Sequence, residues 1–285
     1  MEPRHWRILR LATTQNMILE DVTTPVGTPA WSPFAPDEGY ALILVRDGGF
    51  WREVEGVQRF IDAGGGYLSR EGVEERFASP LGRADVITLI GMTEHAFEEQ
   101  LAGLEHHHGW QVNTSAEFDL RHRELLAAAR RGMDRLEAEE RLVVLLGSLL
   151  QRTERPGRSS MRPATLHEHR RLVSAVQQAL SGGHFTADLD QLARLAGSSP
   201  HHLSRVFRRL TGRTVSAYRN DLRVRAVLED LASGAPDLSA LAADYGFADH
   251  AHLTRTVRRY TATAPSALRR RLSASISAPS TSGVS

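Results

Sequence analysis

The chain has 285 residues, 41% of them hydrophobic, which suggests about two domains with ordinary globular cores. It has no cysteine, which excludes disulfides, thiolate nucleophiles and cysteine-ligated metal sites. It also lacks an apolar run of about 18 residues, so we predict no membrane-spanning helix. Its net charge of +1 is unevenly distributed: residues 1–151 hold 15 Arg and 24 acidic residues, a charge of −9, whereas residues 166–285 hold 16 Arg and 9 acidic residues, a charge of +7. This asymmetry is expected when only one domain meets a polyanion, and the absence of a signal-peptide core predicts a cytoplasmic protein.

Residues 38–90 have the pattern of short strands. Apolar or alternating runs occur at 40–45, 50–54, 57–61 and 86–90, and glycine-rich turn signals such as Asp47-Gly48-Gly49 and Gly64-Gly65-Gly66 separate them. Strands at a spacing of about ten residues are typical of a sandwich or small barrel.

Residues 117–152 have a helical pattern with two apolar stripes. The first stripe runs from Leu125 to Leu136 and the second, more apolar one from Leu142 to Leu150. The second stripe would pack either on its own barrel or on a second subunit, and we lean towards a contribution to a homodimer.

The composition changes again after residue 152. Residues 153–165 contain two prolines, a glycine and several serines, as a linker does, and residues 166–272 are dominated by helical patterns. The tail, residues 273–285, is rich in serine, lacks charged side chains and is predicted to be disordered. We therefore expect an α+β chain with domains at 1–152 and 166–272.

An internal repeat with a period near 50 residues occupies the second half. Four positions recur 49 residues later: Leu189, Leu192, Ala193 and Gly197 recur as Leu238, Leu241, Ala242 and Gly246. The segment 203–210 recurs 50 residues later as 253–260, so the turn of the second copy is one residue longer.

Each copy has the pattern of a helix-turn-helix unit. In the first copy an apolar stripe from Leu189 to Ala196 predicts a helix that ends at Gly197. Ser199 is the predicted N-cap of the second helix and Pro200 its first residue. This second helix would bury the apolar residues Leu203, Val206, Phe207 and Leu210. In the second copy Asp237 and Asp249 are the predicted caps.

The second helix of each copy leaves Arg, His and Ser or Thr side chains off its apolar stripe, and these supply donors for phosphates and major-groove base edges. A predicted helix of about 18 residues between the copies would span about 27 Å. With the packed ends included, the two reading helices would lie near one DNA turn apart, about 34 Å.

Residues 166–272 resemble the DNA-binding domain of the AraC/XylS family of bacterial transcription regulators. The residues that carry the resemblance include Leu189-x-x-Leu192-Ala193, Ser199-x-x-x-Leu203-Ser204-Arg205-x-Phe207, Ala242-x-x-x-Gly246-Phe247-x-Asp249 and Pro265-Ser266. Leu253 and Val257 stand where Phe is frequent, and Ala262 stands where Gly is usual.

The resemblance implies a sequence-specific transcription regulator that binds double-stranded DNA. It implies base or phosphate contacts from His201, Ser204 and Arg205 in the first copy and from His250, Ala251, Thr254 and Arg255 in the second. Arg208 and Arg258 are the better phosphate candidates. A contact with RNA polymerase is left open, and no membrane partner is expected.

The strand-then-helix order of the first half is similar to the small cupin-like barrel that often precedes this DNA-binding domain and serves in effector binding and dimerisation. Aromatic residues that would line an effector pocket are Trp31, Tyr40, Trp51, Phe60, Tyr67 and Phe77. Ordinary core packing is the better explanation for most of them.

Two alternatives remain beside the effector-responsive regulator: a cupin-type metalloenzyme fused to a DNA-binding domain, and a constitutive regulator with a purely structural barrel. Metal cupins need two closely spaced histidines on strands, and no His-x-His lies among these strands. The run His106-His107-His108 is better explained as a loop or surface feature, because contiguous histidines cannot all face one ion, and His167 and His169 adjoin the linker. We therefore predict no enzyme activity, no metal and no cofactor.

Overall fold

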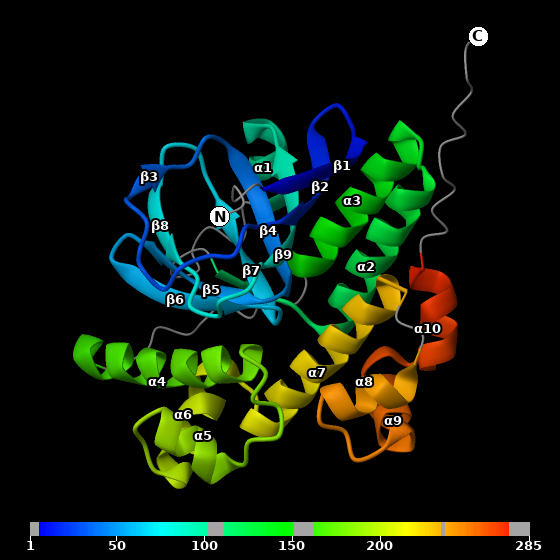
Figure 1. Ribbon diagram of the computed structural model, residues 1–285. Coiled ribbons are helices and arrows are strands. Elements are labelled where there is room, and N and C mark those ends of the chain that lie inside the picture. Colours follow the sequence, from blue (N-terminus) through cyan, green and yellow to red (C-terminus); the bar gives the residue numbers. More distant parts are fainter. Residues whose placement is uncertain (1–5, 102–110, 151–161, 235–236, 274–285) are drawn as a thin grey trace.

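The computed structural model describes residues 6–101, 111–150, 162–234 and 237–273. Strands dominate up to residue 92 and helices dominate the rest (Figure 1). The predicted fold class, a small barrel with helices followed by an all-α domain with two helix-turn-helix units, is confirmed.

Two antiparallel sheets form the barrel. The six-stranded sheet has the order β1 (Arg7–Thr13), β2 (Met17–Thr23), β9 (Val86–Met92), β4 (Tyr40–Asp47), β7 (Gly65–Ser69) and β10 (Gln111–Asn113). The four-stranded sheet has the order β3 (Ala35–Pro36), β8 (Glu74–Ala78), β5 (Gly49–Val54) and β6 (Val57–Asp62).

Alternation along β4 divides the barrel region into two cores. Ile43 and Val45 belong to one buried cluster together with Phe50 of the other sheet. Leu42 and Leu44 face the opposite way and belong to a second cluster with helices α1 (Glu94–Leu101), α2 (Ala116–Arg131) and α3 (Arg135–Leu150). Because side chains alternate along a strand, a strand covered on both faces reads as one continuous apolar run.

The sequence pattern predicted β4, β5, β6 and β9 but missed other elements. The glycines at 64–66 were interpreted as a turn, whereas Gly65 and Gly66 belong to β7. A Cβ atom added to Gly65 would lie 2.1 Å from the carbonyl oxygen of Val112. One added to Gly66 would lie 1.9 Å from the carbonyl oxygen of Ile43. Glycine is needed there for the close approach of neighbouring strands.

Seven helices of the described residues follow: α4 (Pro163–Ser181), α5 (Leu189–Leu195), α6 (Pro200–Thr211), α7 (Val215–Ala232), α8 (Leu238–Asp244), α9 (His250–Thr261) and α10 (Pro265–Leu272). The helix α4 begins at Pro163, within the stretch 153–165 interpreted as a linker. Most of that stretch, and nearly all of the tail 273–285, lie outside the described residues.

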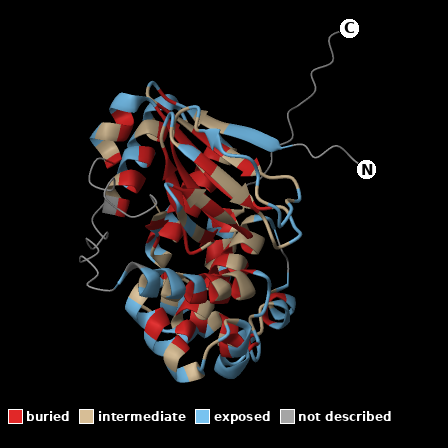
Figure 2. Ribbon diagram, turned by 90° about the vertical axis from the view of Figure 1, so that its left-hand side faces the viewer, coloured by how far each residue is buried: buried red, intermediate tan, exposed pale blue. Residues whose placement is uncertain are grey.

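The helix α7 is shared by two helical cores. Tyr218 and Leu222, in its first half, pack with α4, α5 and α6. Val227 and Leu231, in its second half, pack with α8, α9 and α10. Figure 1 shows α7 running diagonally with α4, α5 and α6 on one side and α8, α9 and α10 on the other, and in Figure 2 buried residues continue from the sheets into the helices. One rigid helix therefore joins the two repeats.

Candidate nucleic-acid interface

The first helix-turn-helix unit is built as the sequence predicts. Asp188 caps α5 in a capping box with Gln191, and Gly197 has the left-handed φ of 65° that ends the helix. Ser199 caps α6 by accepting from the amide of His202, with Pro200 in the first turn. Leu189 departs from the prediction: its side chain is 38% exposed and does not belong to the apolar stripe.

The second helix of this unit, α6, presents a polar face to solvent. Leu203, Val206 and Phe207 are buried under it. His201, Ser204, Arg205 and Arg208 are all exposed, so this face is accessible to a nucleic acid.

The second unit repeats this arrangement with different caps. Asp237 caps α8 and Asp249 caps α9, as predicted. Leu253 and Val257 are fully buried in the core of this unit. The helix ends at Ala262, which adopts a left-handed φ of 56°, where the first unit has Gly212 at 71°.

The helix α9 exposes His250, Ala251, Arg255 and Arg258. Thr254 differs from its counterpart Ser204, because it is only partly exposed and its hydroxyl oxygen is buried without a described hydrogen-bond partner. Thr254 is therefore the weakest of the predicted contact residues in this unit.

A buried arginine fixes the middle of α7 against the barrel domain. Arg225, which is 2% exposed, donates to the carbonyl oxygen of Ala63 at 2.8 Å and to the hydroxyl and carbonyl oxygens of Thr114 at 2.9 and 2.8 Å. Asp221, one turn earlier, accepts from its Nε at 2.9 Å. The domain contact is therefore built from polar groups with specific partners.

One turn before Asp221, Tyr218 donates its hydroxyl proton to the carboxylate of Asp62, at the end of β6, with oxygen distances of 2.6 and 2.7 Å. Asp62 also accepts from the amide of Gly64 at 2.9 Å and from Ser181 at 3.3 Å. Burial raises the pKa of Asp62, although these donors oppose the shift.

The third part of the contact is a chain of alternating charges. Glu229 of α7 pairs with Arg46 of β4 and Arg123 of α2, and Arg46 and Arg130 both pair with Asp21. Burial alone would raise the pKa of Glu229, but Arg123 and Arg46 outweigh it and hold the pKa below its ordinary value. Charges at such depth are stable only with well-placed partners, which fixes the geometry of the contact.

The aromatic residues proposed for an effector pocket do not gather around one cavity but lie in separate places, some of them in pairs. Trp51 and Phe60 pack edge to face at 5.7 Å, and the indole nitrogen of Trp51 donates to Gln178 of α4 at 3.0 Å. Tyr40 packs on Phe97 at 5.2 Å, on the side of the sheet that the helices cover.

Trp31 lies under the guanidinium of Arg76, and Tyr67 lies in the cluster between the sheets with Phe50 and Phe77. The interior beside Tyr67 holds a buried ion pair. Arg52 pairs with Glu75 of β8 and lies 4.3 Å from the centre of the Tyr67 ring. Burial raises the pKa of Glu75 to about 7 despite the neighbouring Arg52.

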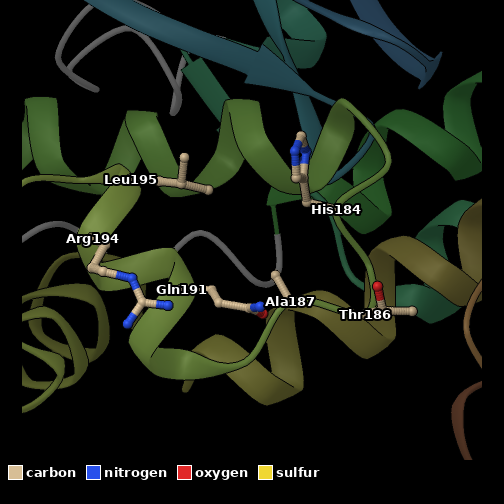
Figure 3. Close-up of a pocket in the computed structure, with 6 residues that line it drawn as sticks. All are labelled: His184, Thr186, Ala187, Gln191, Arg194 and Leu195. Atoms are coloured by element: carbon tan, nitrogen blue, oxygen red, sulfur yellow. The ribbon is translucent and has the colours of Figure 1, made fainter.

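Two hollows on the described surface lie elsewhere. One, of about 480 Å³, is lined by His184, Thr186, Ala187, Gln191, Arg194 and Leu195, from the loop after α4 and from α5 (Figure 3). The other lies between α2 and α3. Neither is lined by the predicted aromatic residues.

Among the described residues, no three His, Asp or Glu side chains gather as a metal site would require. The histidines at 106–108 lie outside the described part of the chain. Within that part, no helix is both long and apolar enough to cross a membrane.

Comparison with known proteins identifies the C-terminal region. Residues 192–271 match the family model described as a helix-turn-helix domain. A search of curated proteins found no match. These residues are therefore a DNA-binding helix-turn-helix domain.

Three solved structures resemble either nearly the whole chain or a part of it. Fatty-acid-bound ToxT from Vibrio cholerae is 11% identical and has a TM-score of 0.36 over 95% of this chain and 98% of its own. The DNA-binding domain of AdpA, in complex with a target DNA, is 28% identical with a TM-score of 0.33 over 35% of this chain and 90% of its own. The C-terminal domain of AraT from Geobacillus stearothermophilus is 19% identical with a TM-score of 0.36 over 42% of this chain and 94% of its own.

All three TM-scores are low, so the match of the family model and the residues of the repeat carry the identification. The domain is of the AraC type, which confirms the resemblance over residues 192–271. It is the DNA-binding module of a transcription regulator.

Proposed function

We propose that this protein is a sequence-specific transcription regulator that reads two successive major grooves with α6 and α9. The observation that supports it is the repetition of an open polar face: Arg205 and Arg255 are exposed at equivalent positions of two units joined by one helix. Arginine donates two parallel hydrogen bonds to guanine, and one chain can then read both sites without a symmetric partner.

Roles within each face follow from position. His201, Ser204 and Arg205 contact bases or phosphates from α6, and His250, Ala251, Thr254 and Arg255 do so from α9. Arg208 and Arg258, one turn further along each helix, contact phosphates. Thr254 reaches DNA only if its buried hydroxyl turns outward.

The barrel is proposed to respond to a small-molecule effector. The Arg52–Glu75 pair beside Tyr67 supplies charged groups inside the barrel, and Arg52 also donates to the carbonyl oxygen of Leu68 in β7 at 3.2 Å. Asp62, at the end of β6, and Ala63, in the turn before β7, bind Tyr218 and Arg225 of the DNA-binding domain. A ligand that displaces this ion pair would therefore act on the strand next to the domain contact.

A homodimer is proposed through α3. Its inner residues Leu142 and Leu145 are buried in the chain's own core, which accounts for most of the apolar stripe. On its outer side Leu136 and Val144 are 68% and 65% exposed. A second copy of the chain would cover these two side chains.

Selection of binding sites from random double-stranded DNA by the full-length protein tests the proposal. We expect an enriched motif, and affinity for it that falls steeply with salt because arginine–phosphate contacts release counterions. If no sequence is enriched, or if affinity is the same at low and physiological salt, the protein is not a sequence-specific regulator.

A further inference from the structure

Two histidines occupy equivalent places in the two reading helices, and both rings are held by an aromatic neighbour. His202 of α6 packs edge to face on His169 of α4, with ring centres 5.6 Å apart. His252 of α9, 50 positions later, packs in the same way on Phe247, 5.5 Å away. In their ring contacts the two histidines are alike.

Their Nδ1 atoms are used differently. A guanidinium nitrogen of Arg205 lies 3.2 Å from Nδ1 of His202, and because arginine can only donate, the histidine nitrogen accepts. In the second unit the backbone amide of Ala248 donates to Nδ1 of His252 at 3.3 Å. His202 thus binds a side chain of the reading face, and His252 binds the turn.

The difference follows from the longer turn of the second unit. The amide of Ser198 donates to Ala193 at 2.9 Å, and the equivalent amide of Phe247 donates to Ala242 at 2.8 Å. The second turn then contains one more residue, Ala248, before its cap at Asp249. The additional amide needs an acceptor, and Nδ1 of His252 supplies it.

We propose that His202 is a positioning residue that orients Arg205 for base recognition, so that the first unit discriminates between sequences more sharply than the second. This rests on the proposed function. Among the described contacts, Arg255 has no counterpart of the bond between Arg205 and His202. Orienting a long side chain before binding lowers the entropy lost on the DNA, which corresponds to roughly a two- to tenfold gain in binding to the correct base.

Two substitutions test the hydrogen-bond acceptor and the aromatic ring of His202 separately. His202→Asn keeps an acceptor the same number of bonds from the backbone but removes the ring, whereas His202→Phe keeps the ring and removes the acceptor. His252→Phe is the matched control in the second unit. Each full-length variant is assayed on the selected site and on copies of it with single base-pair changes, and its thermal unfolding is recorded.

We expect His202→Phe to lose roughly two- to tenfold of the discrimination at the base pairs read by Arg205, and His202→Asn to keep it. His252→Phe should lower thermal stability and leave discrimination at the second cluster unchanged. The inference is overturned if the wild type selects a motif and His202→Phe discriminates as well as the wild type, or if His202→Asn loses as much as His202→Phe. Absence of any motif for the wild type would instead refute the proposed function.

Discussion

The residues that end the two reading helices differ by a single Cβ. Gly212 and Ala262 both adopt a left-handed backbone, with φ of 71° and 56°. A Cβ at Gly212 would have nothing within 4 Å, so any cost of a side chain there comes from backbone strain alone. L-residues in this conformation are strained by roughly 1–2 kcal/mol.

We therefore expect Ala262→Gly to raise the free energy of unfolding by about 1 kcal/mol and Gly212→Ala to lower it by a similar amount. Chemical denaturation of the full chain measures both, and each variant serves as the control for the other. Equal destabilisation by the two substitutions would contradict this account of the helix ends.

His122 gives the stability a pH dependence. Its Nε2 lies 2.9 Å from the hydroxyl of Thr88, and burial, followed by Arg46 and Arg123, lowers its pKa well below the ordinary value. The folded protein keeps this ring neutral, whereas the unfolded chain binds a proton below about pH 6.5. The contribution of His122 to the free energy of unfolding is therefore fully present above that pH and is lost as the pH falls below it.

Urea unfolding of the wild type and of His122→Gln between pH 7.5 and 5 measures this contribution. The wild type should lose about 1.4 kcal/mol more per pH unit than the variant below pH 6.5. Parallel curves for the two proteins would show that His122 does not titrate as its buried position requires.

At the scale of elements, patterns with a local period were predictable and long-range pairings were not. The two helix-turn-helix units could be predicted because apolar spacing, caps and turn glycines lie within about 20 residues of one another. The strand β8 was missed because it carries Glu75, whose partner Arg52 lies on another strand. Likewise, Arg225 and Glu229 are ordinary polar positions of a helix until their partners more than 100 residues away are known.

The aromatic residues proposed to bind an effector show the same limit of prediction from sequence. Aromatic residues in a strand region fit a packed core better than a pocket, but only the fold separates Tyr67, between the sheets, from Trp51, at the domain contact. Leu189 fits the helical period but is exposed, because the period cannot show how far a core extends.

The contact between α7 and the barrel can be tested at one hydroxyl. Tyr218→Phe keeps the ring packed on Phe207 but removes the donor to Asp62. We expect a loss of about 1–3 kcal/mol in unfolding free energy, because a buried carboxylate is left short of a donor. Tyr260→Phe is the matched control, since its hydroxyl donates to a carbonyl oxygen from a partly exposed position. Equal losses in the two variants would argue against a tight domain contact in solution.

At the scale of the whole molecule, the chain is more closely integrated than its sequence suggests. A barrel and a DNA-binding domain were expected as separate units on either side of a linker. The structure instead places α7 against the barrel through Asp62, Arg225 and Glu229. Such polar contacts give less net stability than apolar ones but fix one arrangement of the partners.

The proposed dimer belongs to the same scale. Replacing Leu136 and Val144 together by Ser should convert the dimer to a monomer in sedimentation at tens of micromolar, and the monomer should remain folded because both side chains lie outside the chain's own core. Leu195→Ser, at a residue 58% exposed in α5, is the control and should leave the dimer intact. A wild-type protein that sediments strictly as a monomer would remove the dimer from the account.

The central claim is that two units of one chain each read a base cluster, and the most direct measurement is site selection with arginine variants. Arg205→Ala should lose preference at one cluster and Arg255→Ala at a second cluster about one helical turn away, each at a cost of about 1–3 kcal/mol. Arg208→Ala, a phosphate contact, should weaken all sequences alike and lower the salt slope by about one. The claim would be contradicted by a single recognised cluster of base pairs that is lost in Arg205→Ala and unchanged in Arg255→Ala, because only the first unit would then specify sequence.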